Sequence, residues 1–157
     1  MVVDIGGGTT EIAVMSLGGV VYSESLRVAG DAMDNSLKDY MREEYNLMIG
    51  DSTAEKIKKD IGTAIPTNNN TYAVKGRDLR SGTPKEVNIS EQDTSEALNP
   101  ILKEIVSGIK KALENTPPEL SADLVDMGLT MTGGGSLLKN IDKSCLLYTS
   151  PSPRDSS

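Results

Sequence analysis

The sequence predicts an α/β fold with a mixed β-sheet, covering helices and a small inserted lobe. Two short apolar runs lead into glycine triplets at Gly6–Gly8 and Gly133–Gly135, which is typical of strands that end in loops of close approach. Segments with strand-like and helix-like periods alternate between the triplets. The elements shorten around a polar stretch at residues 68–70, between two amphipathic helices, which indicates the inserted lobe.

The first part of the chain predicts three strands followed by a helix. The strands cover residues 2–5, 11–16 and 20–26, and Leu17-Gly18-Gly19 is a hairpin turn signal between the last two. A helix opens at Ala29-Gly30-Asp31. Its apolar residues recur at about 3.6-residue spacing and would share one face: Met33, Leu37, Tyr40, Met41 and Met48.

The middle of the chain predicts the smaller lobe. Ser52 or Asp51 can cap a helix over residues 53–61, which Gly62 closes. A loop at 66–70 then leads to two strands over 71–74 and 86–89.

The last elements are expected to return to the main sheet. Ser90 caps a helix over residues 90–97, with Asp93 three positions later as a weak capping box. The clearest amphipathic helix covers 101–113 and stops at Thr116-Pro117-Pro118. A short helix over 119–125, a buried strand over 129–131 and a helix start at 136–140 complete the order.

Composition narrows the class of function. The chain has 157 residues, a net charge of −7 and no histidine. An acidic chain lacks the basic patches that nucleic-acid phosphates demand, so no nucleic-acid partner is expected. The absence of histidine removes the commonest general base and metal ligand. No run of about 18 apolar residues and no secretory pattern is present, so we expect a cytoplasmic protein.

The two triplets together suggest one bound nucleotide. Glycine tolerates backbone conformations that point successive N–H groups at an anion, and a helix start after the second triplet would add a favourable dipole. Two such loops held by one sheet would face each other across a shallow cleft at the strand ends. Two ordinary glycine-rich turns remain the alternative interpretation of the pattern.

Both ends of the chain look artificial. Residues 145–155 show no period, are crowded with Ser and Pro, and back-translate into a widely used transposase sequencing adapter. We therefore expect the natural frame to stop near Ser144, which would exclude the one cysteine, Cys145, from any redox or metal argument. The chain also starts inside a predicted strand, so Met1 is expected to be an internal methionine.

Residues 4–11, 53–58 and 117–124, taken together in their order and spacing, resemble the MreB family of the actin-like ATPase superfamily. Residues 4–11 and 132–136 are similar to the second phosphate loop and the adenosine loop of that superfamily. Residues 53–58 and 117–124 look like MreB in the same order and spacing. The resemblance runs from Met1 to about Lys143 and implies an actin-like, ribonuclease H-like ATPase fold, second half only. It places the first phosphate loop and the water-activating glutamate before residue 1.

The resemblance implies two lobes. Residues 1–49 and 98–144 would form a larger, IIA-like lobe, and residues 50–97 would form a smaller, IIB-like lobe. Residues 145–157 would be a non-native tail.

The resemblance also implies a site for ATP and Mg²⁺. Backbone N–H groups of Gly7, Gly8 and Thr9 would bind the β- and γ-phosphates, and Asp4 would hold Mg²⁺ through water. Thr9 would position the attacking water and is the candidate catalytic residue. The other implied nucleotide-binding residues are Glu55, Lys56, Ile57 and Lys58, with Glu55 and Lys58 lining the ribose and adenine, and Gly133, Gly134, Gly135 and Ser136 on the adenine and α-phosphate side.

Each of these positions also has a structural interpretation. Asp4 would suit a cap on the amides of its own loop, and Thr9 would suit an ordinary strand. Glu55 and Lys58 lie three positions apart on one helix face, where exposed ion pairs are common. Gly30-Asp31 matches a loop at the floor of the cleft and equally suits a helix N-terminus.

By this resemblance the chain comes from an ATP-binding, filament-forming bacterial actin homologue that organises cell-wall synthesis and rod shape. Its implied partners are further copies of itself, the cell-wall elongation machinery and membrane-anchored cytoskeletal proteins, at the inner face of the membrane. The segment alone should hydrolyse ATP negligibly. Two alternatives within the superfamily are a sugar kinase or exopolyphosphatase and a chaperone-type ATPase. ATP-driven assembly, as opposed to turnover of a soluble substrate, would separate the first alternative from the leading hypothesis.

Overall fold

The computed structural model describes residues 1–16, 19–119, 130–141 and 145. Strands and helices alternate along the described chain, and most of them match the predicted order. The elements are β1 (Val2–Ile5), β2 (Thr10–Ser16), β3 (Gly19–Leu26), α1 (Gly30–Tyr45), β4 (Leu47–Met48), α2 (Asp51–Asp60), β5 (Thr71–Asp78), β6 (Pro84–Ser90), α3 (Glu91–Glu114), β7 (Thr130–Thr132) and the 3-10 turn η1 (Gly134–Leu137).

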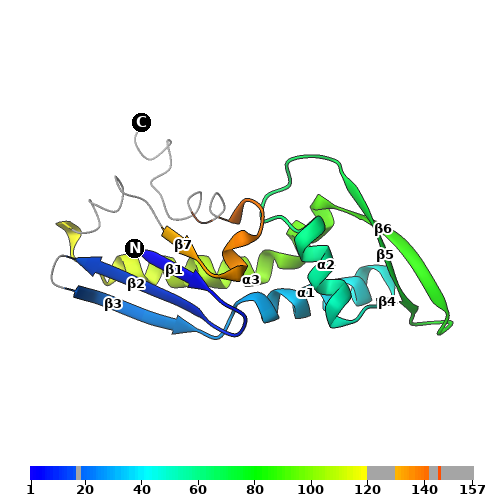
Figure 1. Cartoon of the computed structure of the whole chain (residues 1–157), viewed down its shortest axis with the longest axis horizontal. Coiled ribbons are helices and arrows are strands. Elements are labelled where there is room, and N and C mark those ends of the chain that lie inside the picture. The colour runs from blue at the N-terminus through cyan, green and yellow to red at the C-terminus, as the bar shows by residue number, and fades with distance from the viewer. Residues whose placement is uncertain (17–18, 120–129, 142–144, 146–157) are drawn as a thin grey trace.

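Two separate sheets lie toward opposite ends of an elongated molecule (Figure 1). The larger has the order β3-β2-β1-β7, and its β1–β7 pair is parallel, with Asp4 opposite Thr132. The smaller is antiparallel, with the order β4-β5-β6. Because β1 and β7 run parallel and in register, their glycine triplets leave the larger sheet at the same end, as predicted.

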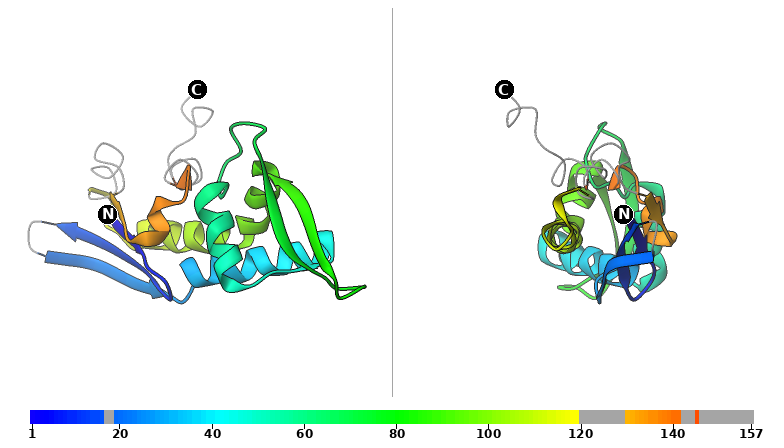
Figure 2. Two further views of the ribbon diagram at one scale, coloured as in Figure 1. Left: turned by 45° about the vertical axis from the view of Figure 1, so that its right-hand side comes forward. Right: turned by 90° about the vertical axis from the view of Figure 1, so that its left-hand side faces the viewer.

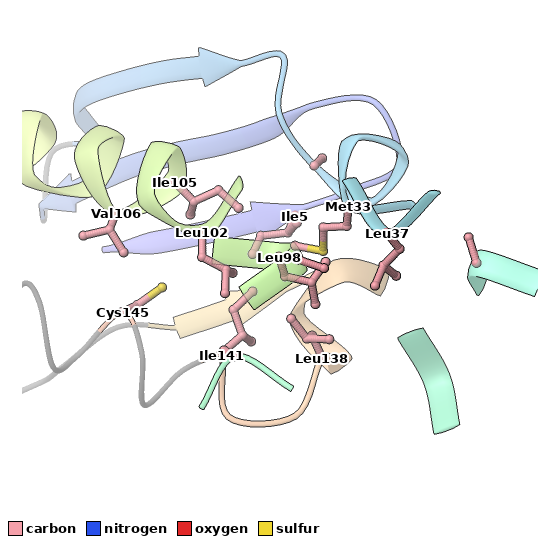
Figure 3. Close-up of a cluster of buried hydrophobic side chains, with 14 of the residues drawn as sticks. Ile5, Met33, Leu37, Leu98, Leu102, Ile105, Val106, Leu138, Ile141 and Cys145 are labelled. Atoms are coloured by element: carbon pink, nitrogen blue, oxygen red, sulfur yellow. The ribbon is translucent and has the colours of Figure 1, made fainter. Parts of the chain in front are cut away.

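Helices α1 and α3 lie side by side and connect the two sheets (Figures 1 and 2). Apolar residues of α3, including Leu98, Leu102 and Ile105, are buried with Ile5 of β1 in one hydrophobic cluster (Figure 3). A methyl group at Gly108 of α3 would lie 2.6 Å from Leu26 Cδ1, so this glycine permits the close approach of α3 to β3. The core therefore fixes β1, the strand that carries the first glycine loop.

Polar contacts also tie α1 to the start of α3. Tyr40 and Tyr45 of α1 donate hydrogen bonds of 2.7 and 3.0 Å to the two carboxylate oxygens of Asp93. Asp93 and Ser90 also form the predicted capping box. Burial and the hydrogen bond to Asp93 raise the pKa of Tyr45 to about 12. Both phenols therefore stay protonated near neutral pH and keep donating to Asp93.

Several predicted boundaries are wrong. Residues 90–97 and 101–113 form one helix through Pro100, because Leu98 and Leu102 on either side are both buried and hold the helix against the core. Helix α1 ends at Tyr45, since Asn46 takes a left-handed conformation with φ 50°, and Met48 lies on β4 rather than on the helix face.

Smaller differences affect the other elements. Helix α2 begins at Asp51 with Gly50 at its N-cap and no side-chain cap, so neither predicted capping residue acts as one. Strands β5 and β6 are longer than predicted because their pairing extends from Thr71↔Ser90 to Arg77↔Pro84. The 3-10 turn begins inside the second triplet, at Gly134, and ends at Leu137, so the predicted helix start at 136–140 is wrong.

The predicted lobe boundaries and tail remain predictions. Strands β5 and β6 form their own sheet, and a division by sheet would place Leu47 and Met48 with the smaller lobe, before the predicted boundary at residue 50. Cys145 is buried and belongs to the core cluster, near Val106 (Figure 3). The rest of the predicted tail, and most of the predicted helix over 119–125, lie outside the described residues.

Candidate functional site

A pocket of about 530 Å³ lies where the two glycine loops meet the first turn of α1 and the end of α2. Its lining is mainly polar or glycine. It comprises Gly6, Gly7, Gly30, Asp31, Glu55, Lys58, Lys59, Asp60, Ile61, Gly62, Asn70, Glu91, Gly134, Gly135, Leu138 and Lys139. Residues from both triplets thus line one pocket, as the cleft prediction requires.

The first glycine loop is fastened through its carbonyl groups. Gly6 N–H donates to Thr9 O at 3.0 Å, which closes the turn. Gly30 N–H and Asp31 N–H at the start of α1 donate to Gly6 O and Gly7 O at 3.0 and 2.7 Å. Within the described chain, the backbone N–H groups of Gly7, Gly8 and Thr9 donate to no other residue. Adjacent uncommitted N–H groups are what an anion-binding loop offers.

The second glycine loop is packed tightly on β1. Gly133 has φ +85°, and a methyl group there would lie 2.5 Å from both Asp4 Oδ1 and Ile5 O. A methyl group at Gly135 would overlap Ile5 Cγ2. Close packing within the chain therefore requires glycine at both positions.

Gly8 and Gly134 differ from their neighbours. A methyl group at either position would meet no atom within 4 Å, and neither residue has a positive φ. Neither internal packing nor backbone strain therefore explains why these residues are glycine. A ligand that approaches both loops closely would explain it.

Lys58 of α2 lies at the junction of α1, α2 and the first loop. Its ammonium lies 2.9 Å from Asp34 Oδ1, 3.3 Å from Glu55 Oε2 and 3.4 Å from Gly30 O. Burial favours the neutral amine, but the two carboxylates outweigh it and raise the pKa of Lys58. Hydrogen bonding and charge from Lys58 lower the pKa of Glu55, whereas burial raises the pKa of Asp34. The predicted Glu55–Lys58 ion pair forms, and both residues also line the pocket.

Glu91 closes the opposite wall of the pocket. Its side chain is only 4% exposed and accepts hydrogen bonds from Thr67 N–H at 3.1 Å and from Lys139 Nζ at 3.2 Å. Burial opposes ionisation, but these donors outweigh it and lower the pKa of Glu91. Thr63 pairs with Lys139 in an isolated bridge, and Asn140 Nδ2 donates to Ile65 O at 2.9 Å. The segment after the second loop is therefore held to residues 63–67.

Asp4 lies at the end of β1, beside the pocket rather than in its lining. It is exposed and accepts a hydrogen bond of 3.1 Å from Thr132 Oγ1. No group of three or more acidic, cysteine or histidine side chains in the described part of the chain could hold a metal ion. A single exposed carboxylate still fits Mg²⁺, which commonly uses one or two carboxylates together with waters and nucleotide phosphates.

The structure brings some predicted residues together and separates others. Gly7, Glu55, Lys58, Gly134 and Gly135 line the pocket, whereas Asp4, Gly8, Thr9, Lys56, Ile57 and Gly133 lie outside its lining. The side chain of Ser136 lies outside the described part of the chain. The side chain of Ile57 is fully buried in the core, and the predicted nucleotide-binding role of this residue stays a prediction. Lys56 is exposed, and Gly8 and Thr9 lie on the exposed part of the first loop.

Sequence reasoning missed Asp34, Glu91 and Lys139. A spacing signal was present for Asp34, which lies one helical turn after Asp31 on the α1 surface that α2 contacts. Glu91 and Lys139 are 48 positions apart and meet only through the tertiary fold, so no local pattern pointed to them.

None of the described helices is long and apolar enough to cross a lipid bilayer.

Comparison with known proteins gives a consistent result. The sequence profile of the MreB/Mbl protein family matches residues 1–150. The cell shape-determining protein MreB of Escherichia coli K12 is 48% identical over 144 residues, which cover 91% of this chain and 42% of that protein. The cell shape-determining protein Mbl of Bacillus subtilis 168 is 46% identical and covers 91% of this chain and 43% of its own length. The chain thus spans less than half the length of these curated relatives.

Solved structures agree with the sequence comparison. MreB5 of Spiroplasma citri bound to AMPPNP superposes with a TM-score of 0.90 at 42% identity, over 96% of this chain and 46% of that one. A subunit of the MamK double helical filament superposes with a TM-score of 0.74 at 23% identity, which supports the fold alone. The actin-like ATPase fold predicted from the sequence is confirmed.

Proposed function

Because the chain belongs to the MreB/Mbl family, we propose that it forms one side of the ATP site of a filament-forming protein that determines bacterial cell shape. The observation that carries this proposal is the pair of open glycines. Gly8 and Gly134 lie on two loops that contribute to one pocket, and no contact within the described chain requires either to be glycine. Family membership argues against the sugar kinase, exopolyphosphatase and chaperone alternatives.

The pocket suggests which residues would contact each part of the nucleotide. The uncommitted N–H groups of Gly7, Gly8 and Thr9 would bind the β- and γ-phosphates. Glu55 and Lys58 would face the ribose and adenine, and Gly134, Gly135 and the backbone of Ser136 would cover the adenine and α-phosphate side. Gly133 would act indirectly, by letting this loop pack on Ile5.

Asp4 would hold Mg²⁺ through water, beside the phosphate loop, and Thr9 would position the attacking water. Bound Mg²⁺ would neutralise charge on the phosphates. Phosphoryl transfer depends on positioning and electrostatics. A chain that forms only one side of the ATP site should therefore hydrolyse ATP negligibly. The remaining length of a full-length relative would supply the other side of the site.

Family membership suggests the wider role. The larger sheet with its helices would be a IIA-like lobe and the smaller sheet a IIB-like lobe. The full-length protein would assemble with further copies of itself at the cytoplasmic face of the inner membrane. There it would act with the cell-wall elongation machinery and membrane-anchored cytoskeletal proteins.

A matched pair of glycine substitutions tests the proposal. Gly134→Val in the full-length protein places a branched side chain in the pocket, whereas Gly50→Val makes the same change outside it, at a position that is also open. We expect Gly134→Val to abolish binding of a fluorescent ATP analogue and ATP-dependent sedimentation of filaments. Gly50→Val should retain both.

Equal binding by both variants would show that the pocket is not the nucleotide site. Failure of the unsubstituted protein to bind the analogue at all would overturn the ATP assignment itself.

A further inference from the structure

Lys58 depends on a residue outside the pocket for its position. Its side chain is 15% exposed and reaches from α2 toward the first turn of α1. A methyl group at Gly30 would lie 3.2 Å from Gly6 O and 3.6 Å from Lys58 Nζ, so α1, the first loop and Lys58 converge at this point. A lysine has a flexible four-carbon stem, so a fixed ammonium at such a junction needs fixed partners.

Asp34 is the partner that α1 supplies. Its side chain is 16% exposed and does not line the pocket, and its Oδ1 lies 2.9 Å from Lys58 Nζ. The contact is an ion pair, and that oxygen has no hydrogen-bond partner in the described chain. Charge attraction therefore dominates the contact, and it draws Lys58 toward α1.

The other partners of Lys58 are weaker anchors. Glu55 lies on the same helix and is 42% exposed, and its second oxygen also pairs with Lys59 at 3.5 Å. The contact with Gly30 O is long, at 3.4 Å. Exposed pairs contribute little, because solvent screens them and their long side chains lose entropy. Asp34 is thus the charged partner that fixes Lys58 to a helix other than its own, and it is less exposed than Glu55.

We propose that Asp34 is a positioning residue of the nucleotide pocket, which holds the Lys58 ammonium against α1 and so orients the Lys58–Glu55 pair toward the ligand. The inference rests on the proposed nucleotide site and goes beyond it, because Asp34 acts through Lys58 without lining the pocket. It also couples the wall formed by α2 to the turn of α1 that holds the first glycine loop through Gly30 and Asp31.

A double-mutant cycle in the full-length protein tests this role. Asp34→Asn keeps the shape of the side chain and removes its charge, and the readout is the Kd of a fluorescent ATP analogue, with Tm measured in parallel. We expect about tenfold weaker binding, in the range of couplings between contacting residues. In a Lys58→Gln background the same change should weaken binding less than about twofold.

Two further variants keep the test decisive. Asp39→Asn removes a carboxylate from the same helix, where it pairs with exposed Arg42, and should leave the Kd unchanged. Asp34→Glu retains the charge but displaces the carboxylate by one methylene, and should give an intermediate Kd. If Asp34→Asn does not fold, the Asp34→Glu result decides alone.

An unchanged Kd in Asp34→Asn, or in Asp34→Glu where only that variant folds, would overturn the inference. Equal losses in the two Lys58 backgrounds would also overturn it, since Asp34 would then act by another route. These results differ from failure of the unsubstituted protein to bind the analogue, which would overturn the proposed function and this inference with it.

Discussion

The two glycine loops leave neighbouring strands of one sheet, yet they use their glycines differently. In the first loop, the carbonyls of Gly6 and Gly7 are bound to α1, and a methyl group at Gly8 would meet nothing. In the second loop, Gly133 and Gly135 are pressed against Ile5 and only Gly134 is open. The first loop is held from behind and presents its amides, whereas the second serves mainly to let two segments of the chain approach.

A glycine triplet therefore has no single structural role. Glycine is favoured where backbone approaches backbone closely, and also where backbone approaches a ligand closely. The sequence shows glycine in both cases and does not distinguish them. Substitutions separate the two, because the first kind costs stability and the second kind costs binding.

The largest loss of stability is expected for Gly133→Ala. Gly133 has φ 85° and ψ 165°, a region that is essentially restricted to glycine and costs other residues about 1–3 kcal/mol. The added methyl group would also lie 2.5 Å from Ile5 O, a backbone atom that cannot rotate away. We expect the free energy of unfolding in urea to fall by about 3 kcal/mol or more. A loss below about 1 kcal/mol would show that the second loop is not packed as described.

An intermediate, pH-dependent loss is expected for Glu91→Gln. Glu91 anchors the end of the second loop through Lys139, and charged hydrogen bonds of this kind contribute about 2 kcal/mol. Its pKa is lower in the folded state than its ordinary value of 4.5. The unfolded chain therefore binds the proton more readily, and the stabilisation is complete above about pH 4.5 and lost as the pH falls through the folded pKa.

Urea unfolding at several pH values checks this sign. The stability gap between the unsubstituted protein and Glu91→Gln should be widest near neutral pH and narrow below about pH 4.5. Glu86→Gln, at an exposed position on β6, is the control and should show no such gap. A gap that widens toward acid pH would contradict the assigned role of Glu91.

Part of the fold could be predicted from the sequence alone. Most of the order of strands and helices follows from local periodicity, and the meeting of the two glycine loops at one end of the sheet follows from two apolar runs that each precede a triplet. The continuity of α3 could not be predicted, because Pro100 is a local helix breaker and burial of Leu98 and Leu102 overrides it. Tertiary packing decides whether such a helix continues, and a short stretch of sequence does not reveal that packing.

Some residues of the site could likewise be predicted from the sequence, and others could not. Residues within one motif, such as Gly7 or the Glu55–Lys58 pair, were predictable because their spacing carries the signal. The burial of the Ile57 side chain was not predictable from its motif, because a matched motif does not say which face of α2 is buried. Asp34 and Glu91 were missed because their partners Lys58 and Lys139 are distant in sequence.

A near-zero effect on stability is expected for Gly8→Ala. The position lacks a positive φ and has open space around it, so alanine fits and restricts the unfolded chain. The free energy of unfolding should change by less than about 1 kcal/mol, and the direction should be stabilising. Binding of the ATP analogue should weaken, because the methyl group occupies space on the ligand side. A variant that is destabilised like Gly133→Ala would remove the contrast between the loops.

The smallest effect on stability, with a selective effect on chemistry, is expected for Thr9→Ala. Thr9 is exposed, its side chain makes no hydrogen bond within the described chain, and Gly6 N–H bonds to its carbonyl, which alanine retains. The loop and its N–H groups should therefore persist, and the Kd of the ATP analogue should stay within about twofold. If the Thr9 hydroxyl positions water, steady-state phosphate release by the full-length protein should slow by about a hundredfold, the scale expected when a reacting group is no longer aligned. Unchanged phosphate release with unchanged binding would remove Thr9 from the catalytic assignment. If the affinity for the ATP analogue instead falls as much as the rate of phosphate release, Thr9 contributes to phosphate binding by the first loop.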